Sequence, residues 1–554
     1  MGENEHTAER AAPGGRHDVV IMGGGLAGLT SALQLKLRFA DIDVLVLERR
    51  SHPVPEAAHK VGESTVEIGA HYFSEVLGLK GHLEASQLRK FGFRFFFSEG
   101  RRDIDQVTEI GASRPLAVTS YQLDRGIFEN FLGEEAQRRG IRFMDSTMVR
   151  SVELGTDGRE HTLTAERAGV KHAFSARWLV DACGRAGLIK RQLGLAQPNA
   201  HTCNAVWFRI KSRIILDDWS DNPAWRARCT PRARWLSTNH LVGAGYWVWL
   251  IPLASGSHSV GIVADPRLHP LERFDTFDKA MDWFAQFQPR LFDELDGKRN
   301  LLQDFAFFRN FSYGCKQVFS AQRWALTGEA GLFLDPFYSP GSDFIAISNT
   351  YITELVAMDR AGRPLGAHAQ LFDQLYHSFY DSTLALYTDQ YGLFGDPEVL
   401  PAKVLWDYTY YWGVLSQLFF QGRLADLGAM AQLRDELAQC QKLNVAVQAF
   451  LREWSAHSEK RNPAVMLDQA ALPWFAELNR SLLDTLDDAQ FRARVRESTH
   501  RLRALAADLL HTAQQAYPGV AGGALQALLQ DSDRGPAHAL ADRESMLLPE
   551  SLPA

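Results

Sequence analysis

Several features that define other classes of protein are scarce or missing in this sequence of 554 residues. It has only five cysteines, an odd number without a Cys-x-x-Cys pair, so we expect neither a disulfide framework nor a metal site. The net charge of −7 lacks the basic excess of a general nucleic-acid binder. No segment reaches the ~20 apolar residues of a membrane-spanning helix, and the polar start lacks the apolar run of a signal peptide. We therefore predict a cytoplasmic protein that binds no nucleic acid and spans no membrane.

What is present is an ordinary globular composition, with 46% hydrophobic and 23% charged residues. Residues 1–15 and 531–554 are expected to be tails. Between them we expect a main module over 16–390 and a helical C-terminal region over 391–530. The stretch "VLWDYTYYWGVLSQLFFQGRL" (404–424) is so apolar that we expect a buried helix there.

The first motif is "HDVVIMGGGLAGLTSALQL" (17–35), which predicts a buried strand, a glycine-rich turn and a helix. Gly23 allows the tight turn, Gly25 the close approach of a pyrophosphate, and Gly28 close packing of helix on strand. A second predicted strand ends at Glu48, where an acid that binds a ribose belongs. Together these elements predict a Rossmann-type dinucleotide site.

A second unusual stretch is "LRKFGFRFFF" (88–97), which we interpret as a strand. With a period of two, Phe91, Phe93, Phe95 and Phe97 share one face, and Lys90, Gly92, Arg94 and Phe96 share the other. From the strand alone, Lys90 could simply meet water, as most lysines do, or it could have a function.

Three further segments resemble the FAD-binding segments of p-hydroxybenzoate-hydroxylase-like flavoproteins. They are "SARWLVDACGRAG" (175–187) with Asp181, "QRWALTGEAGLFLDP" (322–336) with Gly328 and Glu329, and "YQLDRGIFENFL" (121–132) with Arg125. The resemblance implies FAD as the cofactor and an α/β fold. In that fold a Rossmann-type FAD-binding domain is interleaved with an antiparallel β-sheet substrate domain, here followed by the α-helical C-terminal region.

Three shorter motifs narrow the resemblance to the flavin-dependent halogenases, nearer to members that act on phenols or pyrroles. They are "KVGEST" (60–65) with Ser64, "WVWLIP" with Trp247 and Trp249, and "FLDPFYSPG" with Phe333, Pro336, Ser339 and Gly341. Each could be a structural feature alone, but neither a packed strand nor a simple turn explains why they occur together. The resemblance implies that FADH2 and O2 form a flavin hydroperoxide, which a halide converts to hypohalous acid.

The resemblance also implies roles for particular residues. Ser339 and Gly341 would hold chloride or bromide at a helix start, where backbone N–H groups and the helix dipole attract an anion. Lys90 matches the family's lysine between flavin and substrate, and desolvation there would lower its pKa. On this interpretation Lys90 and Arg94 would line one passage. Since only one dinucleotide motif is present, we expect FADH2 to come from a separate reductase.

Two departures from the family pattern affect the predicted substrate. Tryptophan halogenases carry a glutamate where this sequence has Tyr338, so we predict an electron-rich phenol or pyrrole as the substrate, in secondary-metabolite biosynthesis. Pro340 has no N–H to offer a halide. The substrate could be free or tethered to a carrier protein. Two alternatives remain open: a flavin-dependent aromatic hydroxylase and a non-catalytic flavin-binding partner protein.

Overall fold

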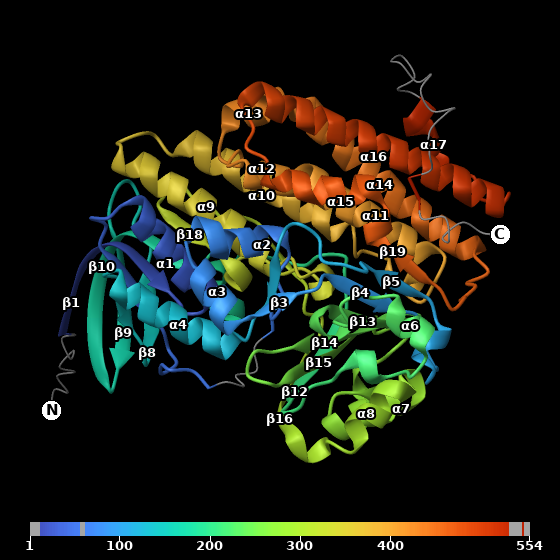
Figure 1. Cartoon of the computed structure of the whole chain (residues 1–554). Coiled ribbons are helices and arrows are strands. Elements are labelled where there is room, and N and C mark those ends of the chain that lie inside the picture. The colour runs from blue at the N-terminus through green and yellow to red at the C-terminus, as the bar shows by residue number, and fades with distance from the viewer. Residues whose placement is uncertain (1–11, 56–60, 531–545, 548–554) are drawn as a thin grey trace, which may run out of the picture.

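The computed structural model describes residues 12–55, 61–530 and 546–547 (Figure 1). Lys60 of the predicted "KVGEST" motif and most of the two predicted tails therefore lie outside the described residues. No helix in the described part is long and apolar enough to cross a membrane. All five cysteines are free thiols.

A seven-stranded sheet carries the dinucleotide motif. Its strands β1, β2 and β7 run parallel, β10 continues the parallel order beside β1, and the hairpin β8–β9 adds antiparallel strands. β18 pairs with the C-terminal part of β10. The strands are β1 (Ala12–Met22), β2 (Val44–Leu47), β7 (Arg142–Met144), β8 (Thr147–Glu153), β9 (His161–Arg167), β10 (Val170–Asp181) and β18 (Trp324–Leu326). β1 begins at Ala12, within the predicted tail, because its first residues pair with β10.

An eight-stranded, mostly antiparallel sheet forms the second layer of the main module. In spatial order its strands are β16 (Leu302–Phe308), β12 (Asn204–Ile210), β15 (His258–Ala264), β14 (Tyr246–Pro252), β13 (Thr238–Gly243), β4 (Phe93–Phe96), β5 (Glu109–Gly111) and β19 (Met466–Asp468). One face packs on α7 (Phe277–Phe287) and α8 (Pro289–Asp296), and the other faces the main core. The predicted α/β fold class, with a Rossmann-type domain, a second sheet and a helical C-terminal region, is confirmed.

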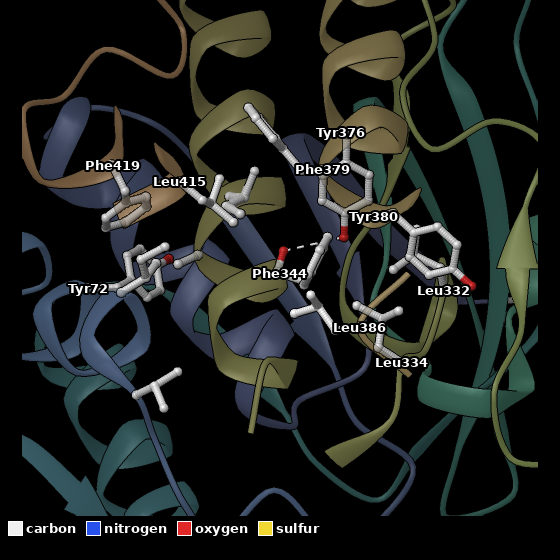
Figure 2. Packing of buried hydrophobic residues seen from close by; sticks show 14 of the residues in the cluster. Tyr72, Leu332, Leu334, Phe344, Tyr376, Phe379, Tyr380, Leu386, Leu415 and Phe419 are labelled. Atoms are coloured by element: carbon white, nitrogen blue, oxygen red, sulfur yellow. Dashed lines mark hydrogen bonds between the residues drawn. The ribbon is translucent and has the colours of Figure 1, made fainter. Parts of the chain in front are cut away.

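The helices that position the site lie beside both sheets. α1 (Leu26–Arg38) packs on α4 (Arg125–Arg138) and on α9 (Gly341–Arg360), and α2 (Glu67–His71) also packs on α9. α10 (Gly366–Leu384) lies along α9, and Figure 2 shows Tyr376, Phe379 and Tyr380 of α10 beside Phe344 of α9. α9 is thus fixed from several sides.

The C-terminal region is helical, as expected, but it does not stand apart. Its main helices are α11 (Val399–Tyr410), α12 (Gln417–Phe420), α14 (Arg434–His457), α15 (Pro473–Arg480), α16 (Asp488–Ala516) and α17 (Gly523–Gln530), and a π-helix over Tyr411–Ser416 joins α11 to α12. β19 adds an edge strand to the larger sheet, next to β5. Met546 and Leu547, within the predicted tail, are buried, and the Met546 N–H donates to Asp508.

The predicted strand over 88–97 is broken in two. β3 (Leu88–Lys90) pairs with β6 (Ser120–Gln122), whereas β4 belongs to the eight-stranded sheet. Gly92, with φ of +89°, makes the break in a backbone conformation that side chains disfavour. Within β4 the alternation holds: Phe93 and Phe95 enter the main core, and Phe96 enters the core under α7 and α8.

Candidate active site

A cavity of about 740 Å³ connects the glycine-rich turn after β1 with the start of α9. Its volume is within the usual range for small-molecule and cofactor sites. The predicted residues that line it are Gly23, Gly25, Glu48, Ser64, Arg125, Trp247, Trp249, Gly328, Glu329, Phe333, Pro336, Ser339 and Gly341. Segments more than 300 residues apart in the sequence therefore line the same cavity.

The three motif glycines differ in surroundings as the sequence suggested. Gly23 has φ of +110°, and a side chain there would meet the backbone of Ala182. Gly28 lies against the Gly23 carbonyl, so helix and turn pack without space for a methyl group. Gly25 faces open space at the start of α1, where a pyrophosphate could approach the backbone. These features fit the diphosphate of FAD.

Glu48 and Arg125 are held in place by backbone groups. The Glu48 carboxylate accepts hydrogen bonds from the N–H groups of Gly24 (2.6 Å) and Arg50 (2.8 Å), at the edge of the glycine turn. Arg125 donates to the Val61 carbonyl at 2.5 Å and pairs with Glu129. Burial lowers the pKa of Arg125 to about 10, so it stays cationic at neutral pH.

Asp181, at the end of β10, is not among the residues that line this cavity. Its two carboxylate oxygens accept hydrogen bonds from the N–H groups of Cys183 (3.0 Å) and Ile189 (2.8 Å). This carboxylate therefore shapes the turn 182–186, and it is that turn which lines the cavity. Asp181 thus supports the backbone of this turn, and its role in binding FAD stays a prediction.

The motif predicted to bind halide forms a turn immediately before α9. Pro336–Tyr338 is a short 3-10 helix, Ser339 has φ of +53°, and the 20-residue α9 begins at Gly341. Ser339, Gly341 and Ser342 all line the cavity. The N–H groups of the first turn of α9 and the helix dipole favour an anion here, although Pro340 donates nothing.

The two motif tryptophans also line the large cavity. Trp247 and Trp249 point to the same face of β14, as predicted. The Trp247 indole donates to the Tyr391 hydroxyl at 2.8 Å, and the Trp249 indole donates to the Ser259 hydroxyl at 3.0 Å. Both rings are therefore fixed rather than free to rotate.

Lys90 lies at the far side of Ser64 from the large cavity. Its ammonium donates to the Ser64 hydroxyl and to the Thr65 carbonyl, both at 2.9 Å, and lies 3.4 Å from the centre of the Phe93 ring. Its side chain is buried, and it borders a second, small cavity. Because Ser64 lines the large cavity and bonds to Lys90, it connects the two spaces.

The pKa of Lys90 is lowered to about 7, mainly by desolvation, although the nearby carboxylates of Glu67 and Asp343 act in the opposite direction. Asp343, in the first turn of α9, accepts hydrogen bonds from the Gly69 N–H (2.8 Å) and the Tyr411 hydroxyl (2.7 Å). Burial raises the pKa of Asp343 to about 8. The lowered pKa expected for Lys90 is found, and neutral amine is accessible near pH 7.

Arg94 does not share a passage with Lys90, contrary to the sequence-based expectation. It is fully buried, pairs with Glu109 and donates to the Ala112 carbonyl at 2.6 Å. Arg234 joins the same carboxylate at 2.8 Å. The break at Gly92 changes the direction of the chain between the two cations, so a simple period of two does not relate them.

The structure adds two residues on α11 that the sequence did not indicate. Tyr338 does not line the large cavity; its hydroxyl donates to Asp407 at 2.8 Å, and Asp407 pairs with Lys403 at 2.8 Å. Burial, followed by the Asp407 charge, raises the pKa of Tyr338 well above its usual value. Lys403 and Asp407 were missed because nothing local in the sequence connects Tyr338 with Asp407, which lies 69 residues later.

His201, Cys203 and Asp335 also come together in the interior, with potential metal-ligating atoms within 4.8 Å of one another. Hydrogen bonds already account for this arrangement: His201 bonds to Asp335 at 2.7 Å, and Asp335 also accepts from Tyr391 at 2.5 Å. Burial raises the pKa of the Cys203 thiol, which disfavours the thiolate that a metal would require.

Comparisons with known proteins agree with FAD as the cofactor. The FAD binding domain family matches residues 16–239. The flavin-dependent halogenase chlA of Dictyostelium discoideum is 24% identical over 436 residues, covering 72% of this chain and 70% of that protein. A 1H-pyrrole-2-carbonyl-[peptidyl-carrier protein] chlorinase of Pseudomonas fluorescens is 25% identical over 346 residues, covering 59% of this chain and 72% of that protein.

Among solved structures, the halogenase PltM in complex with phloroglucinol and FAD has the same fold, with a TM-score of 0.62 at 17% identity. The match covers 88% of this chain and 96% of that one. The domain match and the cavity thus indicate an FAD-binding protein. Within that class the chain is similar to the flavin-dependent halogenases, so the resemblance drawn from its motifs is confirmed.

Proposed function

We propose that this enzyme uses FADH2, O2 and a halide to halogenate an electron-rich aromatic compound of the phenol or pyrrole type. The observation that carries the proposal is the position of Lys90. Through Ser64 its buried amine is connected to the cavity that the glycine turn and the halide motif share. A hydroxylase would need neither the anion-binding turn nor a buried amine beyond it.

In this proposal the large cavity holds FAD, which in its reduced form supplies the electrons that let O2 oxidise halide to hypohalous acid. The backbone at Gly25 and the carboxylate of Glu48 bind the diphosphate and ribose. Ser339 and Gly341 hold the halide at the start of α9. The Lys90 amine receives hypohalous acid, by a hydrogen bond or as a haloamine, and keeps it away from bulk water. The indole rings of Trp247 and Trp249 line the cavity and exclude solvent from it.

Tyr338 supports a phenol or pyrrole as substrate. Its pKa is raised and its hydroxyl already donates to Asp407, so it is a poor base for removing a ring proton at neutral pH. A ring that supplies its own activation needs less assistance. Two relatives are named for pyrrole groups on a peptidyl-carrier protein, and a structural neighbour was solved with phloroglucinol. A free phenol and a carrier-tethered pyrrole are therefore both candidates.

A competition assay tests this function. The purified protein would receive FAD, a separate flavin reductase with NADPH, bromide or chloride, and a mixture of phloroglucinol, simple phenols, pyrroles and tryptophan. We expect halogenated phenol or pyrrole as the main product, and no NADPH oxidation when the reductase is omitted. Halotryptophan as the main product would contradict the substrate assignment. Oxygenated rings formed without halide would identify a hydroxylase. O2 consumption no faster than that of free reduced FAD, with no modified aromatic product, would identify a non-catalytic binding protein.

A further inference from the structure

The small cavity beside Lys90 has a volume of about 40 Å³. It is lined by Glu67 of α2, Phe93 of β4, Tyr408 of α11 and Trp412 of the π-helix, together with Gln469 and the segment 112–120. A space of this size accommodates one to a few water-sized molecules, such as hypohalous acid, but no aromatic ring. A ring would have to enter from the side, with only its reacting edge near the Lys90 amine.

Glu67 is the unusual wall residue. Its side chain is 7% exposed, and Oε1 accepts a long hydrogen bond of 3.4 Å from Asn479. Within the described part of the chain, Oε2 has no hydrogen-bond partner. The Trp412 indole is near enough to lower the Glu67 pKa, but it makes no hydrogen bond of normal geometry among the described residues. A buried carboxylate oxygen without a partner is costly to keep unless a ligand uses it.

Two other carboxylates near this space are already occupied. Asp343 accepts hydrogen bonds on both oxygens, from Gly69 and Tyr411. Asp407 accepts from Lys403, Tyr338 and Gln448. Glu67 alone among these three combines a wall position beside Lys90 with an unused oxygen.

We propose that Glu67 is the base that removes the ring proton during halogen transfer at Lys90, an assignment that rests on the proposed function. A ring carbon forms its bond to halogen with a pair of ring electrons while the O–X bond breaks and hydroxide leaves. The C–H bond at that carbon then breaks, its electron pair restores the aromatic ring, and Glu67 Oε2 takes the proton. Proton and hydroxide combine as water, so the ring and hypohalous acid give halogenated ring and water.

The groups that face Glu67 are consistent with this role. Lys90 provides a positive charge that lowers the Glu67 pKa, whereas burial raises it and is the larger effect. Asp343 and Tyr408 lie near enough to interact with Glu67 electrostatically. A carboxylate with a raised pKa is a stronger base once ionised than an exposed one.

The test is Glu67→Gln, which keeps the shape of the side chain, measured with a phenol carrying deuterium or hydrogen at the reacting position. We expect product formation to fall about 10²–10⁴-fold, as for loss of a general base. FAD binding and O2 consumption should stay unchanged. A deuterium isotope effect near one in the parent should rise to two or more in the variant, since loss of the proton becomes limiting.

Two further variants serve as comparisons. Glu67→Asp keeps a carboxylate, so it should form more product than Glu67→Gln and show a smaller isotope effect. Glu84→Gln changes an exposed position on a neighbouring helix and should behave as the parent. Two results in Glu67→Gln would overturn the assignment of Glu67 but leave the proposed function intact. One is a product yield within threefold of the parent, and the other is a loss of product without an isotope effect. Absence of any halogenated product from the parent protein would overturn the proposed function, and this assignment with it.

Discussion

Two regions of the interior each bury a lysine, and the two lysines differ in the groups that compensate their charge. Lys403 on α11 is fully buried, pairs with Asp407 at 2.8 Å and donates to Gln448 at 2.6 Å. Lys90 is also buried, yet its two hydrogen bonds go to the neutral oxygens of Ser64 and Thr65. The pKa of both amines is lowered by burial, but at Lys403 an adjacent carboxylate counteracts the shift directly.

This difference is the one expected between a structural amine and a reactive one. A lysine in a direct buried ion pair keeps its proton, because removing one charge would leave the other uncompensated. A lysine that is desolvated but bonded to neutral oxygens can lose its proton near neutral pH and become a nucleophile. The small cavity borders Lys90, where a reactive amine would need space for a second molecule.

The largest expected effect on stability is at Lys403. Lys403→Met leaves Asp407 buried without its cation, so we expect the free energy of unfolding to fall by about 3–5 kcal/mol. Lys90→Met, in which no direct ion pair is broken, should be close to neutral or stabilising. Urea unfolding of the two variants checks the comparison, with Lys403→Met/Asp407→Leu as a control that should recover most of the loss. Equal losses at the two lysines would remove the distinction.

The next largest effect is the pH dependence of the rate of halogen transfer, which we expect to follow the protonation of Lys90. With a pKa of about 7, the neutral amine increases nearly tenfold per pH unit below 7 and levels off above it. We expect single-turnover halogen transfer from preloaded FADH2 to follow this profile. Glu67 and Asp343 both raise this pKa, so Glu67→Gln should move the midpoint to lower pH. A rate that falls as pH rises through 7 would show that the ammonium form is the active one.

The same shift affects stability, with a defined sign. The folded-state pKa of Lys90 is about 7 against an ordinary value of 10.5, so between these values the unfolded chain binds more protons than the folded one. This residue therefore makes the protein more stable as pH rises from about 7 to 10.5, and its burial penalty is complete below pH 7. In Lys90→Met the rise in stability that Lys90 causes between pH 7 and 10.5 should be absent. In Lys403→Met this contribution of Lys90 should remain.

The smallest expected effect is on the choice of halide. Pro340 contributes no N–H at the start of α9, so the anion site replaces less of the hydration that a halide loses. Chloride loses more on desolvation than bromide. We expect brominated product to exceed chlorinated product by several-fold at equal concentrations, measured by mass spectrometry. A product mixture dominated by chlorination would contradict this account of the anion site.

The nucleotide end of the fold could be predicted from sequence because its signals are local. A strand, three glycines, a helix and an acid occur in order within about 30 residues, and the surroundings of Gly23 and Gly28 leave no space for other side chains. The family motifs extended this prediction to the fold class. Placing Trp247 and Trp249 on one face required only the period of a strand.

The rest depended on long-range packing. A period of two placed Lys90 and Arg94 together, but Gly92 breaks the strand and sends them to different partners. The edge strand β19 has no signal of its own and forms only because β5 offers an unpaired edge. The pairing of Tyr338 with Asp407 likewise arises only after α11 packs against the turn before α9.

The measurement that tests the central claim most directly is the ratio of halogenated product to O2 consumed in Lys90→Met. We expect this variant to bind FAD and consume O2 at the parental rate while the ratio falls by about 10²–10⁴-fold, because the amine acts only after halide has been oxidised. Lys403→Met, assayed at a temperature where it remains folded, should keep a ratio near that of the parent. An unchanged ratio in Lys90→Met, or an equal loss in both variants, would contradict the role assigned to the Lys90 amine.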